Sequence, residues 1–112
     1  MAKPLFKNYS FEFDSNEKKL LLNFCKSMLK QMSADERFYN DIRTFNSITD
    51  KLNGSSEEIK LTKEEKTKLT FRLKENTDHL RKKLKNAWFI KKWLYKSIYT
   101  QYESLLTNHF SD

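Results

Sequence analysis

The residues best suited to chemistry are basic and aromatic side chains that alternate between His79 and Tyr102. This segment holds seven Lys and Arg residues and no Asp or Glu. Aromatic rings stack on bases or bury against proteins and lipids, while ammonium groups pair with phosphates and carboxylates. The segment therefore predicts a contact surface for an anionic partner. We define its basic aromatic surface as Lys82, Lys85, Phe89, Lys92, Trp93 and Lys96.

Two interpretations of this surface are open from the sequence. Either Phe89 and Trp93 stand outside among the lysines, or both belong to the core and the lysines form a solvated rim. The first predicts a non-catalytic interaction protein that binds an acidic protein or a second copy of itself. Nucleic acid is the alternative partner for the same surface, and an anionic membrane surface also suits this chemistry. No zinc-finger spacing or RNP-type pattern supports the nucleic-acid alternative.

Other residues that carry chemistry have structural explanations. Cys25 lies on an apolar helical stripe, where a thiol is normally buried and inert. Glu75 and His79 are four residues apart, but two ligands do not make a metal site. Most carboxylates fall at helix starts, where capping explains them, and a single Gly cannot build a phosphate-binding loop. We therefore expect no catalytic residue, no cofactor and no metal.

Composition indicates a helical protein. The 112 residues include one Gly and one Pro, too few for a turn-dense β-sandwich, and 14% aromatic residues, which argues against disorder. The length fits a single helical domain over residues 1–112. A lone Cys fits a reducing compartment, and no signal peptide or membrane span is recognisable, so the expected location is cytoplasmic.

The net charge of +7 is concentrated in the second half of the chain. Residues 1–59 hold nine bases and nine acids, whereas residues 60–96 hold thirteen bases and four acids. The remaining residues, 97–112, hold two acids and no base. The basic aromatic surface therefore lies in the only strongly charged part of the sequence.

Four helices are predicted to position these residues, over 15–32, 34–53, 63–85 and 87–109, as an all-α antiparallel bundle. Capping boxes at Asp14, Ser33 and Thr62, each with Glu three residues later, begin the first three helices. Gly54 is expected to end the second helix in a left-handed conformation. The predicted apolar face of the last helix includes Leu94, together with Tyr95, Ile98, Tyr102, Leu105 and Leu106.

Three further expectations concern the connections. Without Gly or Pro after Thr62, an unbroken helix would reach ~70 Å, so we expect a break, at Asn86 rather than at residues 76–78. Residues 1–8 are expected to form a loose arm, and residues 54–58 a loop. The alternating triplets Phe11–Phe13 and Ile59–Leu61 are predicted to pair as a short two-stranded ribbon, the alternative being two independent helix entries.

Overall fold

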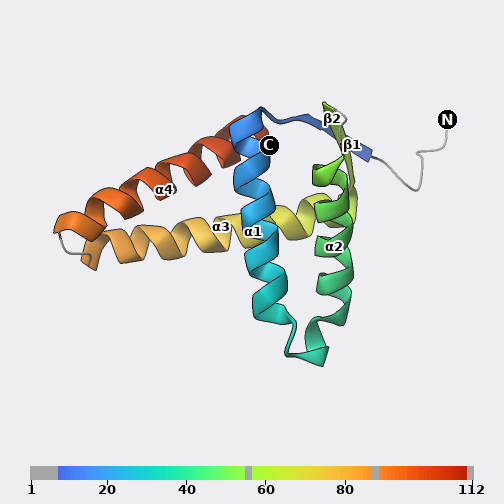
Figure 1. The fold of residues 1–112 in the computed structure, drawn as a ribbon, viewed down its shortest axis with the longest axis horizontal. Coiled ribbons are helices and arrows are strands. Elements are labelled where there is room, and N and C mark those ends of the chain that lie inside the picture. Colours follow the sequence, from blue (N-terminus) through green and yellow to red (C-terminus); the bar gives the residue numbers. More distant parts are fainter. Residues whose placement is uncertain (1–7, 55–56, 87–88, 111–112) are drawn as a thin grey trace. The chain divides into compact units, whose positions relative to one another are not determined.

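The computed structural model describes residues 8–54, 57–86 and 89–110. The elements run in this order: β1 (Asn8–Glu12), α1 (Ser15–Met32), a 3-10 turn (Glu36–Phe38), α2 (Tyr39–Asn53), β2 (Glu58–Thr62), α3 (Lys63–Asn86) and α4 (Phe89–His109). This confirms an all-α fold of four helices with a small ribbon (Figure 1). The chain forms two compact units, Met1–Lys68 and Leu69–Asp112, and α3 continues from the first into the second. The single domain stays a prediction.

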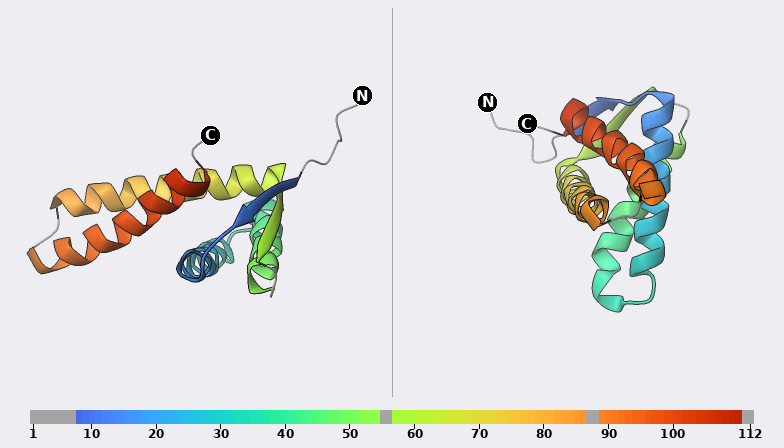
Figure 2. Two further views of the ribbon diagram at one scale, coloured as in Figure 1. Left: turned by 90° about the horizontal axis from the view of Figure 1, so that it is seen from above. Right: turned by 90° about the vertical axis from the view of Figure 1, so that its left-hand side faces the viewer.

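The first unit is built on the antiparallel pair α1 and α2, which lie side by side (Figures 1 and 2). Apolar residues recur at helical spacing on both helices, so each helix buries one stripe. The buried stripe of α1 carries Leu21, Phe24, Cys25 and Met32, and that of α2 carries Phe45, Ile48 and Leu52. Burial raises the pKa of the Cys25 thiol to about 12, although a hydrogen bond with Thr49 opposes the shift.

The ribbon pairs β1 with β2 in antiparallel register, with Phe11 opposite Ile59 and Tyr9 opposite Leu61. Alternation along both strands turns Phe11, Ile59 and Leu61 inward, while Ser10 and Lys60 are exposed. The ribbon predicted from the two triplets is thereby confirmed, with Phe13 buried just after the strand. Asn8 belongs to β1, so the expected arm was wrong at that residue, and residues 1–7 lie outside the described part.

Two of the three predicted capping boxes are present. The Asp14 carboxylate accepts from the amide of Glu17 at 2.7 Å, and Glu17 accepts from the amide of Asp14 at 3.0 Å. At the start of α3, Thr62 Oγ1 accepts from the amide of Glu65 at 3.1 Å, and Glu65 Oε1 accepts from the amide of Thr62 at 2.8 Å. Both boxes follow a strand of the ribbon, so they fix where each strand turns into its helix.

The connection between α1 and α2 differs from its prediction. Ser33 does not cap α2, because its hydroxyl donates back to the carbonyl of Lys30 at 2.9 Å. Asp35 caps the 3-10 turn by accepting from the amide of Arg37 at 2.9 Å, and α2 begins only at Tyr39. Gly54 follows α2 with φ −68° and ψ 161°, so the expected left-handed closure was also wrong.

The second unit contains the α3–α4 pair, which lies side by side in Figures 1 and 2. Helix α3 continues through residues 76–78, where the buried Thr77 hydroxyl donates to the carbonyl of Leu73 at 2.7 Å. It ends at Asn86, as predicted, and Asn86 has no positive φ, so this residue is not in a left-handed conformation. Besides Thr77, the buried side chains among the described residues of this unit are Leu69, Leu73, Tyr102, Leu105 and Phe110. None of the described helices combines the length and hydropathy needed to cross a bilayer.

Candidate functional site

The two interpretations of the basic aromatic surface differ in where they put Phe89 and Trp93, and of these two side chains the structure describes that of Trp93, which is exposed. Its side chain is 77% exposed, the highest value among the large exposed hydrophobic residues of the described chain. The neighbouring Leu94, which the sequence places on the apolar face of this helix, is 52% exposed. Two consecutive apolar side chains therefore face solvent in the second turn of α4.

The exposure of Trp93 follows from the periodicity of α4. Residues nine positions apart in a helix point about 180° away from each other. Tyr102 is buried nine residues after Trp93, so the Trp93 ring points away from the side of α4 that is packed. Lys92 and Lys96 fall within about 100° of Trp93 around the same helix. Both lysines lie on the same side of the indole around α4, Lys96 about 60° and Lys92 about 100° away from it.

The lysines of the basic aromatic surface are exposed. Lys82 and Lys85 come from the last turns of α3, and Lys92 and Lys96 from the first turns of α4. Lys82 Nζ lies 3.8 Å from a carboxylate oxygen of Asp78, which also pairs with Arg81. Within the described residues, no ion pair joins Lys85, Lys92 or Lys96 to a carboxylate. These three ammonium groups are available to a partner.

The remaining predicted member, Phe89, is the first residue of α4, and its side chain lies outside the described part of the chain. Lys83 and Tyr95 form a cation–π contact within this unit, since Lys83 Nζ lies 5.9 Å from the ring centre of Tyr95. Further along α4, a hydrogen bond with Glu103 raises the pKa of Tyr99. The exposed lysines and Trp93 therefore give way to internally paired groups toward the C-terminal part of α4.

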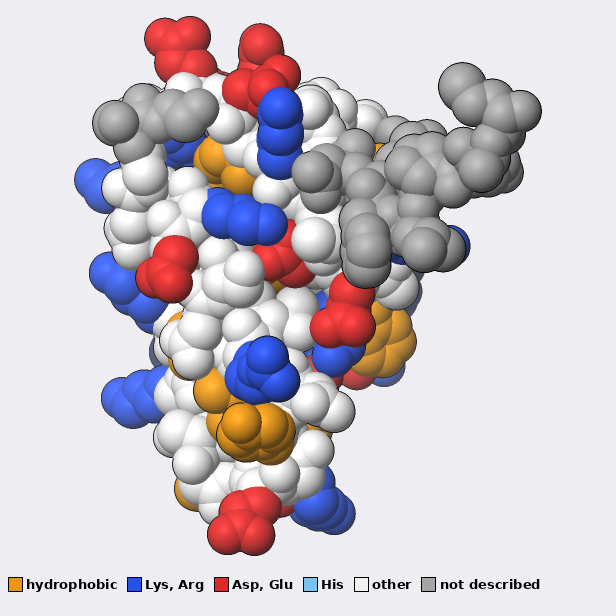
Figure 3. All heavy atoms as spheres, turned by 90° about the vertical axis from the view of Figure 1, so that its right-hand side faces the viewer, with side chains coloured by type: hydrophobic (Ala, Val, Ile, Leu, Met, Phe, Trp, Pro, Cys, Tyr) orange, Lys and Arg blue, Asp and Glu red, His pale blue; other side chains and the backbone are white. Residues whose placement is uncertain are grey.

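The charge of the face that carries α2 and the ribbon is different. Figure 3 shows Lys and Arg side chains interspersed with Asp and Glu on that face, rather than gathered by sign. The ion pair between Lys68 and Asp41 at 2.9 Å is one such contact in the first unit. Mixed charges of this kind give little net attraction for a polyanion. The uncompensated lysines beside Trp93 therefore distinguish the basic aromatic surface.

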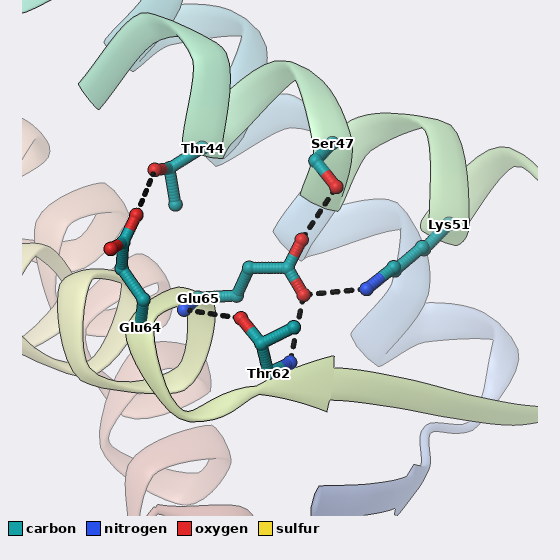
Figure 4. Close-up of polar contacts among 6 residues, drawn as sticks. All are labelled: Thr44, Ser47, Lys51, Thr62, Glu64 and Glu65. Carbon is teal, nitrogen blue, oxygen red and sulfur yellow. Dashed lines mark hydrogen bonds and ion pairs between the residues drawn. The ribbon is translucent and has the colours of Figure 1, made fainter. Parts of the chain in front are cut away.

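A polar hollow of about 430 Å³ in the first unit is a second candidate that the sequence did not reveal. It lies between α2, the end of β2 and the start of α3. Thr44, Ser47 and Lys51 form a polar stripe along α2 at spacings of three and four, and this stripe faces Glu64 and Glu65 (Figure 4). That spacing is the sequence signal that marks the α2 side of the hollow.

Glu65 is the central residue of this hollow and is only 5% exposed. Its carboxylate accepts from Ser47 Oγ at 2.5 Å, from Lys51 Nζ at 2.5 Å and from the amide of Thr62 at 2.8 Å. Burial alone raises the pKa of Glu65, but the hydrogen bonds from Lys51, Ser47 and Thr62 outweigh it and hold the pKa below its ordinary value. Glu65 is therefore ionised at neutral pH.

This arrangement suits structural support better than chemistry. A carboxylate with a lowered pKa is a weak general base, so it activates the Ser47 hydroxyl poorly. The donors around Glu65 join α2 to the turn between β2 and α3, and Thr44 adds a bond to Glu64 at 3.2 Å. Among the described residues, no group of three His, Cys, Asp or Glu side chains is placed to hold a metal ion.

Comparison of this chain with models of known protein families, with curated proteins and with solved structures finds no match.

Proposed function

We propose that this chain is a non-catalytic interaction protein that binds an anionic partner through the basic aromatic surface. The observation that carries the proposal is the exposure of Trp93 at 77%, close in the chain to Lys92 and Lys96, which form no ion pair with the described carboxylates. Lysines of this kind attract and orient an anionic partner, and the exposed indole supplies contact area once the partner has arrived.

The charge pattern supports an anionic partner. No carboxylate occurs between His79 and Tyr102 to repel it. The basic residues lie on two successive helices of one unit, so an extended anionic surface can meet several of them together. An acidic protein, a nucleic acid and an anionic lipid surface all satisfy this requirement.

The test compares two four-lysine reversals. One variant changes Lys82, Lys85, Lys92 and Lys96 to Glu. The control changes four other exposed lysines to Glu, taken from α1 and the start of α3: Lys19, Lys26, Lys30 and Lys63. Both variants change the net charge equally, so only the location differs. The probes are a polyglutamate peptide, random-sequence DNA and RNA, and anionic lipid vesicles.

The proposal expects at least one probe to bind the unaltered chain and the control, and to lose most of its affinity for the first variant. Equal losses in both variants would mean that only net charge matters, and the proposal would then be rejected. Absence of binding to every probe at low salt would also reject it.

Nucleic acid is the alternative partner, because phosphates pair with lysines and bases stack on an exposed indole. Phosphate contacts release counterions, so the logarithm of the affinity falls steeply and linearly with the logarithm of salt concentration. An electrophoretic shift with random DNA and RNA at two salt concentrations measures this slope. No shift at low salt removes the alternative.

A further inference from the structure

We propose that the anionic partner of the basic aromatic surface is the surface of a lipid bilayer that carries anionic headgroups, an inference that rests on the proposed function. In this arrangement Trp93 and Leu94 enter the interfacial layer of the bilayer, and the surrounding lysines face the lipid phosphates. In this mode the chain lies on the bilayer surface and does not cross it.

The apolar part of the surface favours lipid over the other partners. Trp93 and Leu94 are consecutive and are 77% and 52% exposed. Trp is enriched where the headgroups of a bilayer meet its hydrocarbon, because the ring is apolar and its N–H is polar. Leu has no π-face for stacking on a base and no hydrogen-bonding group for base readout. Lipid accepts both side chains without a shaped pocket.

The cations on this surface are lysines, which suit a layer of lipid headgroups. The exposed lysines of this segment come from the end of α3 and the start of α4: Lys82, Lys83, Lys85, Lys91, Lys92 and Lys96. The one arginine of the segment, Arg81, is paired with Asp78. Protein interfaces and base-specific contacts favour Arg over Lys, because the planar guanidinium of Arg donates two parallel hydrogen bonds to one partner group. Lysine instead lays its apolar stem along the interface and places its charge among phosphates.

The experiment measures binding of the full chain to phosphatidylcholine vesicles with and without phosphatidylglycerol, by co-sedimentation. We expect at least about tenfold stronger partitioning onto the anionic vesicles, since each lysine near the headgroups adds attraction. A Trp88→Phe chain leaves Trp93 as its one tryptophan. On the anionic vesicles its emission should shift to the blue and become protected from iodide quenching.

Two variants test the apolar contact. Trp93→Ser should lower partitioning onto anionic vesicles by about tenfold, because the indole no longer enters the interface. Tyr39→Ser is the matched control, since Tyr39 is an exposed aromatic residue at the start of α2 and is 65% exposed. It should leave partitioning unchanged. Circular dichroism melting confirms that both variants remain folded.

Three results would overturn the inference. These are equal partitioning onto neutral and anionic vesicles, equal binding by Trp93→Ser and the unaltered chain, and an unshifted Trp93 emission on anionic vesicles. If polyglutamate or nucleic acid binds in a manner that reversal of the four lysines abolishes, while vesicles do not bind, the lipid inference fails and the proposed function stands. If no probe binds, both fail.

Discussion

At the scale of single residues, Glu65 shows how a buried carboxylate is accommodated. Its carboxylate receives hydrogen bonds from a side chain hydroxyl, an ammonium group and a backbone amide. These donors replace the water that the carboxylate loses on burial. Removing one of them would leave a buried polar group without a hydrogen-bond partner, which lowers stability. Glu65 therefore stabilises the first unit through contacts between α2 and the β2–α3 turn.

Substituting Glu65→Gln should lower the free energy of unfolding by about 1–2 kcal/mol, because a neutral amide pairs poorly with Lys51 and presents a donor to other donors. Urea denaturation followed by circular dichroism measures the change. Glu64→Gln is the matched control, since the Glu64 side chain is 69% exposed and should change stability by less than about 0.5 kcal/mol. Equal effects of the two substitutions would show that the Glu65 contacts do not stabilise the fold.

The acid dependence of stability should differ between the unaltered chain and Glu65→Gln. The pKa of Glu65 is lowered on folding from its ordinary value of 4.5, so its stabilising contribution is fully present above that pH. The contribution is lost as the pH falls through the folded-state pKa, because the protonated group gives up its ion pair with Lys51. The stability gap between the two chains should therefore shrink below pH 4.5. Urea titrations of both chains across the acid range check this, and a constant gap would contradict it.

At the scale of elements, hydrogen bonds at the helix starts separate a true capping box from a sequence match. Asp14 and Thr62 each accept from the amide three residues later, whereas Ser33 donates to the carbonyl of Lys30 at the end of α1. The first two satisfy amides that have no partner within their helices. Ser33 satisfies no amide of α2.

Replacing Asp14 or Thr62 by Ala should therefore lower the free energy of unfolding by about 1 kcal/mol each. Ser33→Ala should cost less than about 0.5 kcal/mol, because it removes only an exposed bond to a carbonyl. Thermal melting of the three variants under one buffer condition gives the comparison. A loss at Ser33 as large as that at Thr62 would restore the sequence-based assignment of the second box.

The elements that the sequence predicts well are those governed by local rules. Apolar spacing and two capping boxes locate α1 and α3, and alternation in two triplets locates the ribbon. The start of α2 was misplaced because Asp35 offers a competing cap within two residues of Ser33. The Asp35 carboxylate also accepts a hydrogen bond from the Arg37 guanidinium, and this contact favours the tight 3-10 turn between α1 and α2.

The two candidate sites also differ in how far the sequence predicts them. The sequence left open whether Trp93 is exposed or belongs to the core, and its side chain is 77% exposed. Periodicity placed Leu94 on the apolar face of the last helix together with Tyr102 and Leu105, and of these three Leu94 is exposed while the other two are buried. The Glu65 contacts join residues that are 14 and 18 positions apart, so they depend on how α2 and α3 pack and not on local pattern.

At the scale of the whole molecule, the uneven charge sets how this protein meets other molecules. Residues 60–96 hold nine more bases than acids, while residues 1–59 are neutral. Long-range attraction therefore acts mainly through the basic part of the chain, and salt weakens it over a Debye length of about 10 Å at 0.1 M. The same charge opposes a second copy that approaches with its own basic aromatic surface.

Binding of an anionic partner and self-association should consequently respond to salt in opposite directions. Added salt screens the attraction between lysines and an anionic probe, so the affinity falls. It also screens the repulsion between two lysine-rich surfaces, so any dimer that buries Trp93 and Leu94 should become stronger. We expect a monomer at low salt, and we expect any association at high salt to be lost in Trp93→Ser. Sedimentation velocity and light scattering across a salt series measure both states. A dimer that is strongest at low salt and unaffected by Trp93→Ser would contradict this, because the contact between copies would then lie on another surface.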